Sequence, residues 1–220
     1  MGVEHPGENV GYTAREEYLS EDVVQNYVRN RFSGALGRYR FWREQRAVSS
    51  ILEQVPSQEV EVILDCPTGI GRWLPNLAAL EPQRIVAVDV SPTMLKQAKT
   101  VSLKGVSIEF RQGAAEELPF EDDSFDLVFC HALLKHLPES AQFQVISELA
   151  RVTSDYVIVA ASVRRGPAGF IRRFRQSKGA VAVSREWFER STACSGLRIV
   201  SSRKATTPIG VEFSYLLRKV

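Results

Sequence analysis

Two aspartates and two glycines follow the spacing of a nucleoside-binding site. Asp65 ends the apolar run VILD, Gly69 and Gly71 follow in a loop, and Asp89 ends the next apolar run, RIVAVD. Glycines let the backbone turn tightly and let a ligand approach the amides at a helix N-terminus. A carboxylate at the tip of the second parallel strand can accept hydrogen bonds from both ribose hydroxyls. The four residues therefore predict a nucleoside site, although a glycine turn alone often only connects two elements.

The residues around the glycines separate two kinds of nucleoside cofactor. A dinucleotide fold has a third small residue three positions after the second glycine, and this chain has Leu74 there. A side chain that large opposes the close packing of helix and strand expected around a pyrophosphate. A nicotinamide oxidoreductase is therefore the less favoured interpretation, and absence of nicotinamide binding would exclude it.

Three segments resemble the class I S-adenosylmethionine-dependent methyltransferases of the small-molecule type. LDCPTGIGR is similar to the glycine motif of that family, VDVSPTMLKQAK to its ribose motif, and GAAEELPFEDDSFDLVFC to its adenine and post-adenine motifs. The resemblance covers residues 60–163 well and the remainder in outline. It implies S-adenosylmethionine as the cofactor, methyl transfer as the reaction and S-adenosylhomocysteine as the product.

The resemblance also implies which residues hold the cofactor. The loop after Asp65 would lie beneath the methionine part, Asp89 would bind the ribose, and Met94 would pack near the adenine. The implied cofactor residues are Asp65, Pro67, Thr68, Gly69, Gly71, Asp89, Val90, Met94, Ala114, Ala115, Glu116, Cys130 and His131.

The chain departs from the family pattern at two of these positions. Pro67 replaces the first glycine of the loop and removes an amide donor. Ala114 stands where the family usually has an acid that accepts from the adenine amino group. A lost hydrogen bond of this kind is worth on the order of 1 kcal/mol, so we expect cofactor affinity to fall several-fold. The departures keep open an alternative, a catalytically inactive cofactor-binding regulatory or partner subunit of the same fold.

His131 and His136 are the candidate catalytic residues. An imidazole titrates near neutral pH, so it can take the proton that an oxygen or nitrogen nucleophile loses during attack on a methyl group. Methyl transfer also proceeds largely by alignment of the reactants. His136, in the segment LLKHLP, is therefore interpreted as a residue that shapes its loop in preference to a base, and His131 is the preferred base. No metal is expected, because Cys66, Cys130 and Cys194 lack the spacing of metal ligands or of a disulfide framework.

Two regions are expected to bind the acceptor. The segment after the fifth predicted strand is basic and lacks acids, and guanidinium groups match phosphate and carboxylate groups. A solvated basic face is the alternative. In the N-terminal helical region, aromatic and arginine side chains would cover the cofactor, or the aromatics would only pack the helix. The residues expected at the acceptor are Tyr39, Trp42, Arg43, Arg164, Arg172, Arg173 and Arg175.

The charge and motif content narrow the acceptor class. The formal net charge of +2 predicts no bulk attraction to nucleic acid. The sequence after the fourth predicted strand is CHALLKH, not the Asn/Asp-Pro-Pro-aromatic run of amino-methylating nucleic-acid enzymes, and no RNA-binding motif is present. We expect a small-molecule acceptor, or the end of a glycan or lipid.

No segment has the apolar length of a membrane span or the pattern of a leader, so we expect a cytoplasmic protein. The oligomeric state is left open.

The alternation of apolar runs and helical segments predicts a single α/β domain with a Rossmann-like, doubly wound, seven-stranded sheet. The sheet is expected to be mostly parallel, with an antiparallel C-terminal hairpin at its edge, because the link KATTPIG contains no helix. The expected strands are 60–65, 84–89, 106–111, 125–130, 156–162, 197–203 and 211–220. Helices are expected from about 71, from 91, over 138–151 and over 184–195. Within the domain we expect a helical cap (1–57), a cofactor-binding core (58–163), a basic substrate loop (164–183) and a C-terminal helix with antiparallel strands (184–220).

Overall fold

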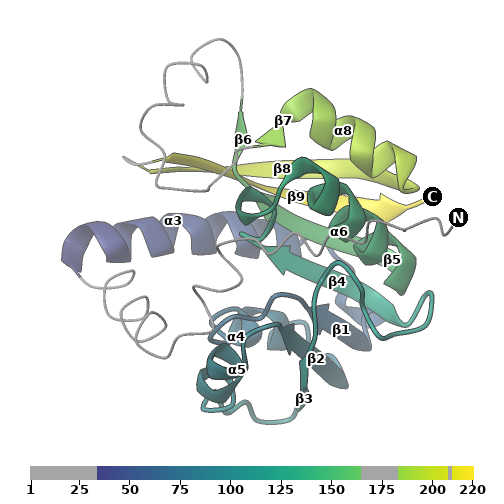
Figure 1. The fold of residues 1–220 in the computed structure, drawn as a ribbon. Coiled ribbons are helices and arrows are strands. Elements are labelled where there is room, and N and C mark those ends of the chain that lie inside the picture. The colour runs from purple at the N-terminus through teal and green to yellow at the C-terminus, as the bar shows by residue number, and fades with distance from the viewer. Residues whose placement is uncertain (1–33, 165–182, 208–209) are drawn as a thin grey trace, which may run out of the picture.

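The fold is built on one seven-stranded mixed sheet. The computed structural model describes residues 34–164, 183–207 and 210–220. The strand order is β3-β2-β1-β4-β5-β9-β8, with β1 to β5 parallel and β9 and β8 antiparallel (Figure 1). The strands are β1 (Val62–Asp65), β2 (Arg84–Asp89), β3 (Ser107–Gln112), β4 (Phe125–His131), β5 (Thr153–Ala161), β8 (Leu197–Thr207) and β9 (Gly210–Lys219). The predicted fold class and the antiparallel edge hairpin are confirmed.

Five α-helices and two short 3-10 turns connect the strands in the described residues. A separate pair of two-residue strands, β6 (Val163–Arg164) and β7 (Val183–Ser184), was not predicted. The helices are α3 (Gly34–Leu52), α4 (Leu74–Ala78), α5 (Pro92–Ala98), α6 (Glu139–Val152) and α8 (Arg185–Cys194), and the 3-10 turns are η1 (Ser57–Glu59) and η2 (Leu134–His136).

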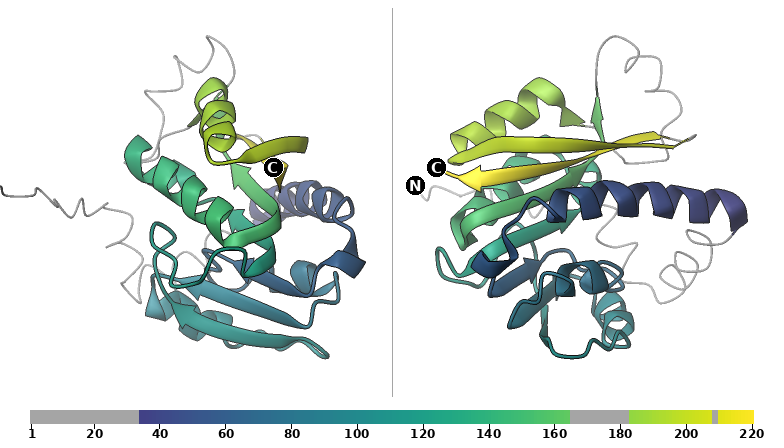
Figure 2. Two further views of the ribbon diagram at one scale, coloured as in Figure 1. Left: turned by 90° about the vertical axis from the view of Figure 1, so that its right-hand side faces the viewer. Right: turned by 180° about the vertical axis from the view of Figure 1, so that it is seen from behind.

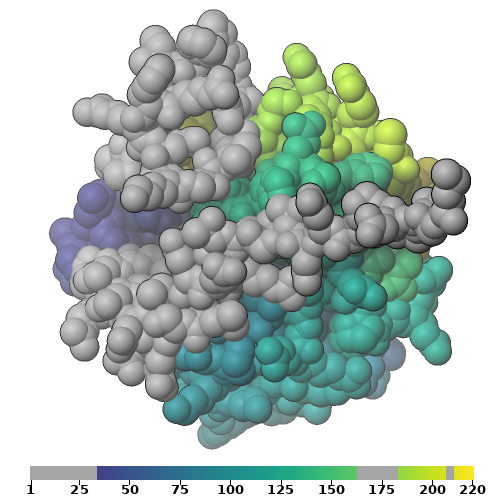
Figure 3. Space-filling model, viewed as in Figure 1, coloured from purple at the N-terminus to yellow at the C-terminus, as the bar shows by residue number. Residues whose placement is uncertain are grey.

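Helices cover both faces of the sheet, as the predicted double winding requires. One core joins the sheet to α6 and α8 through residues such as Val145 and Phe188. The other core joins it to α3 and α4 through residues such as Ile51 and Leu77. Figure 2 shows α3 running alongside β8 and β9, and in Figure 3 α6 and α8 lie together on the molecular surface. In the described part of the chain, no helix combines the length and apolar character of a membrane span.

Local sequence signals explain where the helices begin. The Ser91 side chain accepts from the Met94 amide and caps α5, and Ser184 caps α8 in the same way. One predicted boundary is wrong: the helix expected from about residue 71 begins at Leu74. Gly69 and Gly71 have positive φ angles of 57° and 76°, so the chain remains in turns until it has passed them. The other predicted boundaries differ by a few residues from the observed ones.

Successive side chains of a strand point to opposite faces of the sheet, and this alternation places Asp65, Asp89 and His131 on the same face. Ile63, Ala87 and Phe129 pack in the core beneath α3 and α4. Side chains two positions further on point to the same face of a strand. Asp65, Asp89 and His131 therefore end their strands on the α3 side of the sheet.

Helix α3 is tied to the C-terminal hairpin at its far end. Ser201 donates to Gln54 Oε1 at 2.7 Å, just beyond the helix, and Arg203 Nε donates to Ser50 Oγ at 3.1 Å. These bonds join segments about 150 residues apart in the chain. They hold α3 so that its middle turns can reach the carboxyl ends of β1 and β4.

Candidate cofactor and acceptor site

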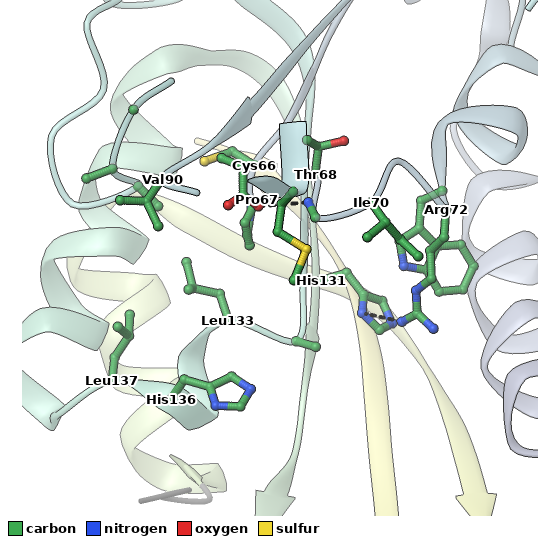
Figure 4. Close-up of a pocket in the computed structure, with 18 of the residues that line it drawn as sticks. Cys66, Pro67, Thr68, Ile70, Arg72, Val90, His131, Leu133, His136 and Leu137 are labelled. Atoms are coloured by element: carbon green, nitrogen blue, oxygen red, sulfur yellow. Dashed lines mark hydrogen bonds between the residues drawn. The ribbon is translucent and has the colours of Figure 1, made fainter. Parts of the chain in front are cut away.

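A pocket lies at the carboxyl ends of β1 to β4 (Figure 4). Open α/β sheets bind ligands at this edge. The segments after four successive strands contribute to its wall. The lining residues are Cys66, Pro67, Thr68, Gly69, Ile70, Arg72 and Trp73 after β1, Asp89, Val90 and Met94 after β2, Gly113, Ala114, Ala115 and Glu116 after β3, and His131, Ala132, Leu133, His136 and Leu137 after β4.

The two glycines of the first loop have different structural roles. A Cβ added to Gly69 would meet no atom of the described residues within 4 Å, so among these residues open space lies beside the loop there. A Cβ added to Gly71 would lie 2.9 Å from Leu74 Cδ1 and 3.2 Å from the Ala98 Cα. Gly69 therefore allows a ligand to approach the backbone, whereas Gly71 allows the loop to pack against α5.

Asp89 connects the first loop to the tip of β2. The Gly69 amide donates to Asp89 Oδ2 at 2.8 Å, and the Ser91 amide donates to Asp89 Oδ1 at 2.9 Å. Burial raises the pKa of Asp89, and its hydrogen bonds from backbone amides oppose that shift. Each carboxylate oxygen has a further lone pair, so Asp89 can also accept from a ligand hydroxyl in the pocket.

Asp65 lies beneath the loop and does not line the pocket. Thr68 donates its hydroxyl to Asp65 Oδ2 at 2.7 Å, and Oδ1 has no hydrogen-bond partner in the described part of the chain. Burial raises the pKa of Asp65 from 3.8 to about 7, against the opposing effect of the Thr68 hydrogen bond. The nearby carboxylate of Asp89 raises this pKa further, whereas Arg72 lowers it.

A charged network joins α3 to the first loop and to β4. Arg72 Nη1 donates to Glu44 Oε2 at 3.0 Å, and Arg40 Nε donates to Glu44 Oε1 at 2.9 Å. Glu44 is only 4% exposed. Arg72 Nη2 also lies 3.1 Å from His131 Nδ1, the contact drawn in Figure 4. The Arg72 guanidinium lies 4.6 Å from the centre of the Trp73 ring, which in turn lies 4.7 Å from the His131 ring.

The Arg72 contact fixes the tautomer of a neutral His131 ring. A guanidinium can only donate hydrogen bonds, so Nδ1 must accept from it. The ring hydrogen of neutral His131 is then carried by Nε2. The general-base role expected for His131 stays a prediction, and in this arrangement Nδ1 can take a proton only after the Arg72 bond breaks. His136 lines the pocket from η2, near Leu133 and Leu137 (Figure 4).

Most of the predicted cofactor residues come together at the pocket. Asp65, Gly71 and Cys130 do not line it, and Cys130 packs in the core on the α6 side. Sequence reasoning missed Arg72 and Trp73, which follow the glycines and were interpreted as the start of a helix. The predicted residues that line the pocket are Pro67, Thr68, Gly69, Asp89, Val90, Met94, Ala114, Ala115, Glu116, His131 and His136.

The residues predicted at the acceptor lie away from the pocket wall or outside the described part of the chain. Tyr39 and Trp42 are 45% and 46% exposed on α3. Neither they nor Arg43 line the pocket, whereas Glu44 on the same helix reaches Arg72. Arg164 is in β6, but its side chain, together with Arg172, Arg173 and Arg175, lies outside the described residues.

A second group of side chains adjoins the pocket at His131. Single ligand-type atoms of Glu44, His131 and Glu212 all lie within 4.8 Å of one another. Glu212 comes from β9, where it pairs with Ala205 of β8. The sequence did not indicate this group, because its members are separated by more than 80 residues in each case.

The sheet order and the position of the pocket are those of the class I S-adenosylmethionine-dependent methyltransferase fold, and solved structures of that fold superpose on this chain. Magnesium protoporphyrin IX methyltransferase from Synechocystis PCC 6803, solved with bound S-adenosylhomocysteine, superposes with a TM-score of 0.77 at 15% identity, covering 94% of this chain and 98% of that one. A [4+2]-cyclase, SpnF, superposes with a TM-score of 0.62 at 16% identity, covering 78% of this chain and 79% of that one.

The sequence comparison finds similarity to methyltransferases in the core of the chain. Residues 63–155 match the model of a methyltransferase domain family. A demethylmenaquinone methyltransferase from Lactiplantibacillus plantarum is 32% identical over 146 residues, which are 64% of this chain and 59% of that protein. The matches to this and the next two curated relatives span 30–59% of the relatives' lengths. Residues 63–155 thus match a methyltransferase domain, in the part of the chain that carries the quoted motifs.

Proposed function

We propose that the protein is an S-adenosylmethionine-dependent methyltransferase that transfers a methyl group to an oxygen or nitrogen of a small acceptor. The observation that carries the proposal is the position of Asp89, at the tip of β2 and bonded to the Gly69 amide beside open space. A carboxylate at this position is suited to the two hydroxyls of a ribose.

The residues of the pocket fit such a cofactor. Asp89 would hold the ribose, and Met94 with Ala115 would offer apolar surface to the adenine. The loop from Pro67 to Gly69 would lie beneath the methionine part, next to Arg72, whose fixed positive charge suits a carboxylate. When bound, the cofactor supplies an activated methyl group on a sulfonium. The chain contributes orientation and exclusion of water, which account for much of the acceleration of such a transfer.

The acceptor class is supported by relatives and by the remainder of the pocket. The relatives named above are named for demethylmenaquinone and magnesium protoporphyrin IX, both small molecules. His131, Leu133, His136 and Leu137 form an apolar wall with two imidazoles beyond the glycine loop. For an anionic acceptor, we expect that neutralising Arg172, Arg173 and Arg175 together raises the acceptor KM, whereas unchanged kinetics would exclude the basic loop from binding.

Isothermal titration calorimetry tests the cofactor site first. We expect micromolar binding of S-adenosylhomocysteine and none of NADH. Asp89→Asn should weaken S-adenosylhomocysteine binding by about tenfold, because one charge-assisted hydrogen bond is lost. The matched control is Glu109→Gln, which removes a carboxylate from β3 away from the pocket wall. Equal affinities of both variants would contradict the ribose assignment.

A catalytically inactive partner subunit is the second candidate, favoured by Pro67 and Ala114. The fold does not decide between the two, since a cyclase shares it. Transfer of tritium from methyl-labelled S-adenosylmethionine to any acceptor in a metabolite extract would establish the enzyme. Failure to bind S-adenosylhomocysteine at millimolar concentration would exclude cofactor binding and favour a partner role.

A further inference from the structure

We propose that Glu212 is a catalytic base, which takes the proton from a phenolic hydroxyl of the acceptor as that hydroxyl attacks the methyl group. The proposal rests on the proposed function, because it assigns the nucleophile of the acceptor in the same site. It begins from the group formed by Glu44, His131 and Glu212, of which His131 lines the cofactor pocket.

The topology brings Glu212 to the chemically active edge of the sheet. β9 runs antiparallel to β5 and pairs its start with the carboxyl end of β5, where Phe213 lies opposite Ala161. Leu216 of β9 packs in the core beneath α3, and Glu212 shares its face of the strand because their numbers differ by an even count. Glu212 therefore projects on the same side of the sheet as His131.

Glu212 has an unused acceptor atom. Its Oε1 is buried and has no hydrogen-bond partner among the residues that the structure describes. A buried carboxylate oxygen without a partner costs free energy, so native proteins satisfy such atoms or use them in function. A hydroxyl of a bound acceptor would supply the missing donor.

The two neighbours of Glu212 are already engaged by Arg72. Glu44 accepts from Arg72 and Arg40, and His131 Nδ1 accepts from Arg72. Protonation of Glu44 or of His131 Nδ1 would weaken these buried bonds. Glu212 is the member of the group whose protonation breaks no such bond, which makes it the proton acceptor.

The same contacts argue against a metal ion in this group. A metal bound to His131 Nδ1 would displace the guanidinium of Arg72. A metal bound to Nε2 would require that nitrogen to lose its hydrogen while Nδ1 still accepts from Arg72. Arg72 therefore acts as the cation of the group.

The proposed step balances without a further reactant. The O–H bond of the phenol breaks and its proton moves to Glu212 Oε1. The oxygen lone pair forms the new bond to the methyl carbon, and the carbon–sulfur bond breaks with its electron pair left on sulfur. The products are the aryl methyl ether, S-adenosylhomocysteine and protonated Glu212. A phenol suits a carboxylate base because phenols ionise near pH 10, whereas aliphatic alcohols are far weaker acids.

The test measures methyl transfer to phenol, 4-cyanophenol and 4-nitrophenol, whose acidities rise in that order. For Glu212→Gln we expect kcat with phenol to fall about 100-fold. The loss should shrink along the series, because an acidic phenol needs the base least. Glu212→Asp should recover part of the rate, and the control Glu109→Gln should retain all of it. An equal loss on all three phenols would overturn the proposal, since a structural role affects them alike.

Calorimetry with S-adenosylhomocysteine separates this proposal from the proposed function. We expect wild type and Glu212→Gln to bind it equally. If wild type does not bind it, the proposed function fails. If wild type binds it but methylates only amines, or no phenol of the series, the function stands and the role of Glu212 fails. Loss of activity in EDTA that Zn²⁺ restores would assign the group to a metal and also overturn the proposal.

Nitrogen-15 NMR of His131 provides a second test that needs no acceptor. We expect the neutral ring to carry its hydrogen on Nε2, and Arg72→Gln to remove that preference. A neutral His131 with its hydrogen on Nδ1 would show that Nδ1 does not accept a hydrogen bond from Arg72. His131 would then again be the candidate base, which would contradict the role of Glu212.

Discussion

Replacement of Asp65 by asparagine should raise the free energy of unfolding, relative to wild type, more at pH 8 than at pH 5. Asp65 is fully buried at the end of β1, with one oxygen bonded to Thr68 and the other without a partner among the described residues. Asparagine has nearly the same shape and can keep the acceptor for Thr68, but it carries no charge at any pH. The change of its effect with pH therefore reports the free energy of burying the carboxylate charge.

The magnitude follows from the pKa of Asp65, which burial raises from 3.8 to about 7. Each pKa unit corresponds to about 1.4 kcal/mol, so ionised Asp65 lowers the free energy of unfolding by at most about 4 kcal/mol. Below pH 4 the carboxyl is protonated in both states and the effect is absent. Between pH 4 and 7 the unfolded chain ionises first and binds fewer protons, so stability falls as pH rises. Above pH 7 the difference is constant.

Urea unfolding at pH 5 and pH 8 measures this effect. The free energy of unfolding of Asp65→Asn, relative to wild type, should increase by about 2–3 kcal/mol between the two pH values. The absolute value at one pH is less informative, because the asparagine NH2 group also loses hydrogen bonds to water. Glu117→Gln, at an exposed carboxyl, is the control and should follow the pH dependence of wild type. A difference between Asp65→Asn and wild type that does not change with pH would refute the reasoning.

Two further predictions concern residues that hold the site together. In chemical unfolding, Glu44→Ala should destabilise the fold by about 3 kcal/mol, because it leaves the charge of Arg72 without its buried partner. Arg40→Ala, at the more exposed end of the same network, should cost less than about 1 kcal/mol. Gly71→Ala should lower thermal stability more than Gly69→Ala, since a Cβ at position 71 would collide with Leu74. Gly69→Ala should mainly reduce the affinity for S-adenosylhomocysteine, measured by calorimetry. Equal effects of the two glycine variants on both measurements would contradict the separate roles of these residues.

The sequence predicted the core of the fold because its signals are local and periodic. The runs ending at Asp65 and Asp89 are apolar, short and followed by turn residues, which fixes both the strands and the edge where they end. Ser91 and Ser184 predicted the starts of their helices through capping chemistry. The start of α4 could not be predicted in this way, because positive φ angles at Gly69 and Gly71 delay the helix without any change in hydrophobic pattern.

The acceptor side of the site is harder to predict from the sequence, because it depends on contacts between distant segments. Tyr39 and Trp42 were chosen for their residue types, yet helical geometry turns them outward and turns Glu44 toward Arg72. Glu212 carried no signal in the sequence, since a glutamate in a strand of the predicted C-terminal edge hairpin is normally a solvated residue. Only the pairing of β9 with β5 brings it to His131.

The network around Arg72 links substrate chemistry to the packing of the N-terminal helix. Glu44 holds Arg72 from α3, Arg72 sets the tautomer of His131 on β4, and α3 is itself anchored to β8 through Ser201 and Arg203. A shift of α3 would therefore move the guanidinium and release His131 Nδ1, which would then compete with Glu212 for a proton. Whether a carboxylate or an imidazole takes the proton in this protein thus depends on Glu44 of α3 and not on the glycine loop that would hold the cofactor.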